Sequence, residues 1–246
     1  MKKILFITLT MLAIGSVQAQ DTTQIKQTID PSKPTNLYTQ VNGQFEYRDT
    51  KDSSGSKLTG TRFNIQYAIN KDNLLFIEVP LMNNPSTKKF GLSDVRVRYF
   101  NAVKRNITSR FIAIAPFADI TMPTGSVSNG LGSGNWSLAA GVVGGFILTS
   151  KLAIFPGVSY VHITNVNSNG VGFQLNGSYS FNKSTFMFVN PTPAFLNNGG
   201  KWTSIWSGDV TLNKVVVPNK FKMNIGCEPN FTFNTYNYKL GATIFL

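Results

Sequence analysis

The chain has 246 residues, of which only 14% are charged, 12% are aromatic and 21 are glycine, and its formal net charge is +12. One cysteine, Cys227, excludes an internal disulfide, and one cysteine with one histidine cannot build a transition-metal site. The lysines are dispersed and the chain starts with an export signal, so we expect no nucleic-acid partner. The stretch Gly130-x-Gly132-x-Gly134 opens no predicted helix and is not a phosphate loop, so we expect no cofactor either. Composition alone leaves a soluble β-sandwich and a membrane β-barrel open.

Residues 1–19 predict a cleaved secretory signal peptide. Lys2 and Lys3 precede an apolar run over 4–14, and Val17-Gln18-Ala19 places small residues before a cut at Ala19. The run is too short to span a membrane, and no later stretch is long and apolar enough for a transmembrane helix. A membrane protein without such helices must be a barrel. We interpret the polar residues 20–36 as a periplasmic N-terminal tail.

From residue 37 onwards the sequence alternates between apolar and polar residues, which predicts strands. Short connections, as at Lys71-Asp72 and Ser150-Lys151, are expected to alternate with longer ones, such as 123–134. This pattern predicts an all-β fold, a transmembrane antiparallel β-barrel of about 12 strands over 37–246, with both termini in the periplasm. The predicted strands are 37–48, 59–70, 72–82, 92–104, 108–122, 135–147, 150–163, 170–181, 184–195, 202–213, 219–230 and 235–246.

The polar faces of these strands predict a charged lumen, and the aliphatic faces, such as Leu75, Ile77 and Val79, predict contact with lipid. Prolines inside the fifth, seventh and ninth strands imply bulges or strained pairing, so those faces are not assigned. Opposed charges in a narrow barrel can cross-link the wall or line a polar pathway, and a one-sided basic wall would favour anionic solutes. The candidate lumen residues are Glu46, Arg62, Asn64, Glu78, Asp94, Arg96, Arg98, Arg110, Asp209, Lys222, Glu228 and Lys239.

Three short motifs carry a resemblance to a known family. They are Gly91-Leu92-Ser93-Asp94, the segment 118–126 with Pro123-Thr124-Gly125, and Leu131-Gly132-Ser133-Gly134. With these motifs the sequence resembles the outer-membrane family named for the MetA pathway of phenol degradation, whose members are described as transporters. The resemblance implies uptake of small, often aromatic or hydrophobic compounds. The same residues also suit a strand-loop-strand, because Pro123 ends a strand and Gly125 allows a tight turn.

An enzymatic alternative depends on His162, the only histidine. Outer-membrane lipid hydrolases place a histidine and a serine two residues apart on one strand, with the histidine as general base. Thr164 occupies the second position in this chain and is a poor substitute for that serine. An interfacial histidine near Trp136 and Tyr160, at the level of the lipid headgroups, is the simpler interpretation. We therefore predict no catalytic residue, and keep a lipid-modifying hydrolase and a non-conducting structural barrel as alternatives.

The last strand resembles the C-terminal signal that the barrel assembly machinery reads. Its residues are Lys239, Gly241, Ile244, Phe245 and Leu246, with a terminal leucine where an aromatic residue is usual. A closed barrel needs this strand to pair with the first one. The sequence thus predicts a channel or transporter for small aromatic, hydrophobic or anionic solutes in the outer membrane of a Gram-negative bacterium. Its expected partners are outer-membrane lipid, the assembly machinery and a small-molecule solute.

Overall fold

The computed structural model describes residues 30–32, 37–51 and 55–246. The predicted signal peptide and most of the predicted tail lie outside these residues. Within them no helix is both long and apolar enough to cross a membrane. The strands are β1 (Gln40–Thr50), β2 (Lys57–Ala68), β3 (Asn73–Asn84), β4 (Lys89–Leu92), β5 (Val95–Asn101), β6 (Lys104–Arg105), β7 (Phe111–Met122), β8 (Ser137–Ile147), β9 (Leu152–Ile163), β10 (Ser168–Asn182), β11 (Thr185–Pro191), β12 (Ala194–Asn198), β13 (Lys201–Ile205), β14 (Gly208–Val217), β15 (Phe221–Asn230) and β16 (Thr235–Phe245).

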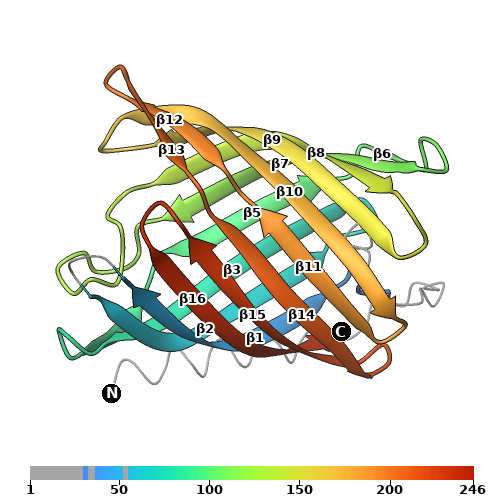
Figure 1. The fold of residues 1–246 in the computed structure, drawn as a ribbon, viewed down its shortest axis with the longest axis horizontal. Coiled ribbons are helices and arrows are strands. Elements are labelled where there is room, and N and C mark those ends of the chain that lie inside the picture. Colours follow the sequence, from blue (N-terminus) through green and yellow to red (C-terminus); the bar gives the residue numbers. More distant parts are fainter. Residues whose placement is uncertain (1–29, 33–36, 52–54) are drawn as a thin grey trace.

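These strands form one closed antiparallel barrel (Figure 1). β1 pairs with both β2 and β16, and β10 pairs with β11 and β12, so the sheet has no free edge along its main path. Three positions in the wall are each occupied by two successive short strands, namely β4 with β5, β11 with β12, and β13 with β14. The short strand β6 pairs only with β7. The predicted twelve-stranded barrel is confirmed.

The prolines act on the wall in two different ways. Pro116 faces outward within β7 and pairs with Val142, and the register between β7 and β8 shifts elsewhere, between Phe111 and Ala113. On the other side of β7 the pairing does break at Pro116: β5 pairs with β7 as far as Phe117, and β6 resumes the pairing at Ile114 with the register shifted by one residue. The expected distortion at Pro116 is therefore present on that side. Between β11 and β12 the chain does break, but both segments keep one register on β10. The Pro193 carbonyl there still accepts the Phe173 amide hydrogen at 2.8 Å, which keeps the two strands joined.

The two ends of the barrel differ in their connections. The "terminal end" carries the starts of β1 and β15, the C-terminus and the connections 69–72, 102–110, 148–151, 183–184 and 218–220. The "loop end" carries the end of β1, the start of β2 and the connections 85–88, 123–136, 164–167, 199–200 and 231–234. In Figure 1 the terminal end, marked by β6 and the C label, lies on the right. The strict alternation of short and long connections is wrong, because 102–110 is longer than the turn 199–200.

The barrel is apolar outside and polar inside, the reverse of a soluble domain. On β2, Phe63 and Tyr67 point outward and are 42% and 48% exposed, whereas the inward Arg62 is 8% exposed. Thr243 and Glu46 are among the most deeply buried side chains of the described residues. A large contiguous apolar exterior marks a surface made for a non-aqueous environment. The interior is correspondingly the place to search for function.

Candidate functional site

Arg62 is the centre of an ion-pair network that crosses the junction of β1 and β16. Its Nε lies 2.8 Å from Glu46 Oε1, and its Nη1 donates to Glu78 Oε1 at 3.0 Å, with Glu228 Oε2 3.8 Å away. Lys239 Nζ donates to Asp209 Oδ2 and Glu228 Oε1, each at 2.9 Å. We call the six residues Glu46, Arg62, Glu78, Asp209, Glu228 and Lys239 the carboxylate cluster. It links β1, β2, β3, β14, β15 and β16 in a single network.

A second network lies on β5 and β7. Arg96 Nε donates to Asp119 Oδ1 and Oδ2 at 3.0 and 2.9 Å, and Arg98 Nε donates to Asp119 Oδ2 at 2.5 Å. The Arg98 guanidinium also lies over the rings of Phe117 and Phe100, with its Cζ 4.9 and 5.5 Å from their centroids. We call Arg96 and Arg98 the arginine pair. Two cations share one carboxylate here, so this network carries one positive charge in excess.

The other predicted lumen residues have separate roles. Asn64 donates to Asn42 Oδ1 at 3.2 Å, and Lys222 Nζ donates to Asn213 Oδ1 at 3.1 Å without a carboxylate partner in the described part of the chain. Asp94 lies beside a lumen cavity, but its carboxylate accepts backbone amides of the connection 123–136. Arg110 corrects the prediction: it is exposed in the turn before β7, because β7 begins three residues later than predicted.

Sequence reasoning missed several lumen residues, and two of them are charged residues on strand faces. Asp119 faces inward with Ala113, Ala115 and Phe117, but Pro116 led us to leave the faces of this strand unassigned. Arg48 shares the face of Glu46 and lines a cavity near the loop end, and it is the last residue of the predicted strand 37–48. Applying the period of two through Pro116 and to the end of the strand 37–48 would have found both. The expected one-sided basic wall is also wrong, because Arg62 and Lys239 lie among carboxylates.

The three motifs behind the family resemblance meet at the loop end. Ser93 Oγ donates to the Leu131 carbonyl at 2.5 Å, Thr124 Oγ1 donates to the Ser93 carbonyl at 2.7 Å, and Asp94 accepts the Ser133 amide at 2.7 Å. At Gly125 an added Cβ would lie 2.5 Å from the Leu131 carbonyl oxygen, so only glycine fits there. These residues hold the connection 123–136 folded, with Leu131 buried against Leu58 and Met82.

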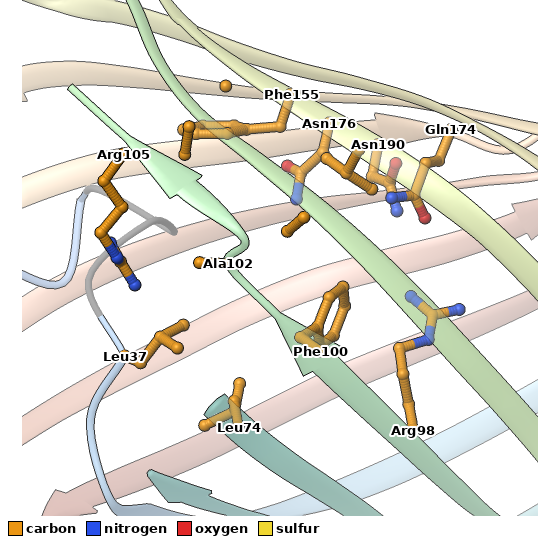
Figure 2. Close-up of a pocket in the computed structure, with 14 residues that line it drawn as sticks. Leu37, Leu74, Arg98, Phe100, Ala102, Arg105, Phe155, Gln174, Asn176 and Asn190 are labelled. Carbon is orange, nitrogen blue, oxygen red and sulfur yellow. The ribbon is translucent and has the colours of Figure 1, made fainter. Parts of the chain in front are cut away.

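The lumen contains adjoining cavities that run between the two ends. The cavity nearest the terminal end is lined by Leu74, Ala102 and Arg105, and also by Asn176, which lines the next cavity as well (Figure 2). That second cavity shares Arg62 with one that reaches the loop end. The cavities therefore follow one another along the barrel axis and share lining residues. Most of its lining away from the terminal end is polar.

His162 lies on the outer side of the barrel, near the loop end. Its Nδ1 is 2.7 Å from Asn169 Oδ1, which also accepts the Tyr160 hydroxyl at 2.7 Å. Thr164 is bonded to the backbone of Trp136. The imidazole thus contacts an amide and not a nucleophilic hydroxyl. Its surroundings are those of the predicted interfacial histidine, with Trp136 and Trp202 exposed at the same end.

The C-terminal residues divide between the two faces of the wall. Lys239 belongs to the carboxylate cluster, and an added Cβ at Gly241 would lie 2.7 Å from the Gln44 Cβ. Ile244 and Leu246 are exposed on the outside. Phe245 turns inward at the terminal end and packs edge-on against Tyr38, with ring centroids 6.1 Å apart. This contact explains why an aromatic residue stands one place before the terminus.

No protein-family model and no characterised protein sequence matches this chain. Solved structures do match its fold. The NanC porin is 13% identical with a TM-score of 0.63, covering 84% of this chain and 100% of that one. The KdgM porin in complex with disordered oligogalacturonate is 14% identical with a TM-score of 0.56, covering 83% and 98%. The chain therefore shares the barrel fold of outer-membrane porins, and the MetA-pathway resemblance rests on its short motifs alone.

Proposed function

We propose that this protein is a channel in the outer membrane of a Gram-negative bacterium and that it passes small solutes, with a modest preference for anions. The observation that carries the proposal is the series of adjoining lumen cavities that extends from Leu74 and Arg105 at one end to Phe233 at the other. The apolar exterior fits a hydrocarbon environment, and the porin fold is consistent with it. In this arrangement the terminal end faces the periplasm.

The lumen is lined by charges that are mostly paired. The carboxylate cluster has four acids and two bases, and the arginine pair has two bases on one acid, so their charges largely cancel. Paired charges keep a narrow passage hydrated without a strong barrier for either sign of ion. Selectivity should therefore be modest and should depend on the few cations that lack a full partner, such as Lys222.

The terminal end adds a positive field. Each of its five connections carries at least one basic residue, whereas the longest connection of the loop end, 123–136, carries none. Basic rims raise the local concentration of anions and their rate of entry. The KdgM structure holds an oligogalacturonate, and an anionic solute would suit the present rim equally well. The basic residues of this rim are Lys71, Lys104, Arg105, Arg110, Lys151, Lys183 and Lys220.

The test is the conductance of the refolded barrel in a planar lipid bilayer under a potassium chloride gradient. We expect discrete current steps and a reversal potential on the anion side. Replacing Lys71, Lys151, Lys183 and Lys220 together with glutamine should move that potential toward cations, whereas Lys201→Gln at the loop end should move it less. A folded barrel that inserts without current steps would favour the non-conducting alternative.

We further propose that the last strand directs assembly, with the assembly machinery and outer-membrane lipid as partners. β16 pairs with β1 and β15 along nearly its whole length. Deleting 241–246 removes the terminal part of both pairings and should leave a protease-sensitive chain outside the membrane. The readout is heat-modifiable migration on gels, and normal migration of the truncated protein would contradict this role.

A further inference from the structure

The cavity at the terminal end differs from the rest of the lumen. Its walls are apolar on most sides, with Leu37 and Leu74 on one side and Phe155 on another (Figure 2). Its volume is about 160 Å³. An apolar protein cavity of roughly 150 Å³ holds a benzene molecule. The space therefore fits an apolar body about the size of one six-membered ring.

One side of this cavity is polar and carries hydrogen-bonding groups that have no partner among the described residues. The carboxamide oxygens of Asn176 and Asn190 are buried without a hydrogen-bond partner in the described residues, and both amides line the cavity. Arg98 projects from β5 on the opposite wall of the cavity, with its guanidinium directed toward the side of the amides (Figure 2). Its Nε and Nη2 contact Asp119, while its Nη1 has no bond to a described residue. Arg98 Nη1 and the amide nitrogens of Asn176 and Asn190 can donate hydrogen bonds to a ligand, whereas the two carboxamide oxygens can only accept them.

The charged residues around the cavity indicate the net charge that a ligand should carry. Arg105 at the other side of the cavity is neutralised by Asp72, with Nε and Oδ1 2.8 Å apart. Arg98 has no carboxylate of its own, since Asp119 also holds Arg96. One negative charge beside Arg98 would balance this network. A second charge would face Leu74 and Phe155, where it would lose hydration without gaining a partner.

From this cavity we infer a binding site for a small monocarboxylate with an apolar body of about one ring. Its carboxylate accepts hydrogen bonds from Arg98 and from the Nδ2 groups of Asn176 and Asn190, and its body packs between Phe100, Phe155 and Leu74. A neutral hydrocarbon would leave the excess positive charge at Arg98 unbalanced, and an inorganic anion would leave the apolar walls empty. The site rests on the proposed channel function, because the cavity lies at one mouth of the same lumen.

The test is calorimetric titration of the folded barrel in detergent with benzoate, acetate and benzyl alcohol. Benzoate should bind at least about tenfold more tightly than acetate, which lacks the body, or benzyl alcohol, which lacks the charge. Arg98→Gln should weaken benzoate binding about tenfold or more and leave benzyl alcohol unchanged. Ala115→Phe, which fills the cavity, should weaken both. Lys201→Gln, an exposed cation at the loop end, is the matched control.

The outcomes separate the site from the channel. Benzoate binding no tighter than acetate binding, or unaffected by Arg98→Gln in a variant that keeps heat-modifiable migration, overturns the site. Chloride conductance can persist in that case, and the channel function stands. Selective benzoate binding by a barrel that never conducts supports the site and overturns the channel. Conduction that benzoate blocks in the unmodified barrel but not in Ala115→Phe supports both.

Discussion

The carboxylate cluster and the arginine pair use the same chemical groups in opposite proportions. Around Arg62 and Lys239, four carboxylates surround two cations, and the network ties six wall strands together, including the closing pair β1 and β16. Around Asp119, two cations share one carboxylate, and the network ties only β5 and β7. The first is arranged to close the wall. The second leaves one positive charge in the lumen without a carboxylate of its own.

This difference shows that a charged lumen residue cannot be assigned a role from its charge alone. Arg62 and Arg98 both face inward, but Arg62 contacts three carboxylates and Arg98 shares one. A fully enclosed ion pair contributes to stability mainly because breaking it leaves buried charge behind. A cation with part of its binding capacity free contributes to binding and selectivity instead. The two networks should therefore respond oppositely to mutation.

The largest effect is expected when the carboxylate cluster loses its centre. Arg62→Met leaves Glu46, which is fully buried, and Glu78 without the cation that forms their ion pairs, while Lys239 stays paired with Asp209 and Glu228. Removing one partner of a buried ion pair costs about 3–5 kcal/mol. Urea unfolding of the barrel in lipid vesicles measures this loss. Equal stability of Arg62→Met and the unmodified barrel would mean that the cluster does not hold the wall closed.

An arginine placed on the outer face of the wall measures how much the free energy of unfolding falls when a cation has no partner at all. If the barrel sits in the membrane as proposed, Ile77→Arg faces hydrocarbon near the middle of β3 and costs about 2–4 kcal/mol. Asn64→Arg faces the lumen and lies opposite Glu78 in the strand register, so it should cost much less. The same urea experiment compares the two variants. Equal losses would contradict the assignment of the two faces.

The arginine pair is expected to respond less strongly when its only acid is neutralised. Asp119→Asn keeps the shape of the side chain but removes the charge that accepts from both Arg96 and Arg98. Hydrogen bonds to charged groups contribute about 1.5–3 kcal/mol, so the unfolding free energy should fall by about that amount. The channel should also become more anion-selective, because two guanidiniums remain. A shift of the reversal potential toward cations would contradict this.

The sequence predicted the wall better than it predicted these networks. The period of two, set by geometry within each strand, placed the polar faces of β2, β3, β5 and β15 correctly. Partner choice depends on register between strands that lie far apart in the chain, such as those of Arg62 and Glu228. No local pattern in the sequence indicates that contact. The sequence therefore could not distinguish a cation whose charge is balanced by several carboxylates from one that shares a single carboxylate. Arg98 keeps part of its positive charge unbalanced because its one carboxylate partner, Asp119, also pairs with Arg96. Only the structure shows this shared contact.

The smallest effect on stability, and the sharpest on function, is expected for Arg98→Gln. Arg96 keeps its bonds from Nε to both Asp119 oxygens, so the carboxylate stays paired and the barrel should unfold at nearly the same urea concentration. Replacing both arginines would instead leave the buried Asp119 without a cation and confuse the two roles. The single change takes the net charge of this network from one positive to zero. The reversal potential in a potassium chloride gradient should then move toward cations, while Arg98→Lys, which keeps the charge, should leave it in place. If Arg98→Gln unfolds the barrel as readily as Arg62→Met does, the arginine pair is also a wall cross-link and the contrast between the two networks disappears.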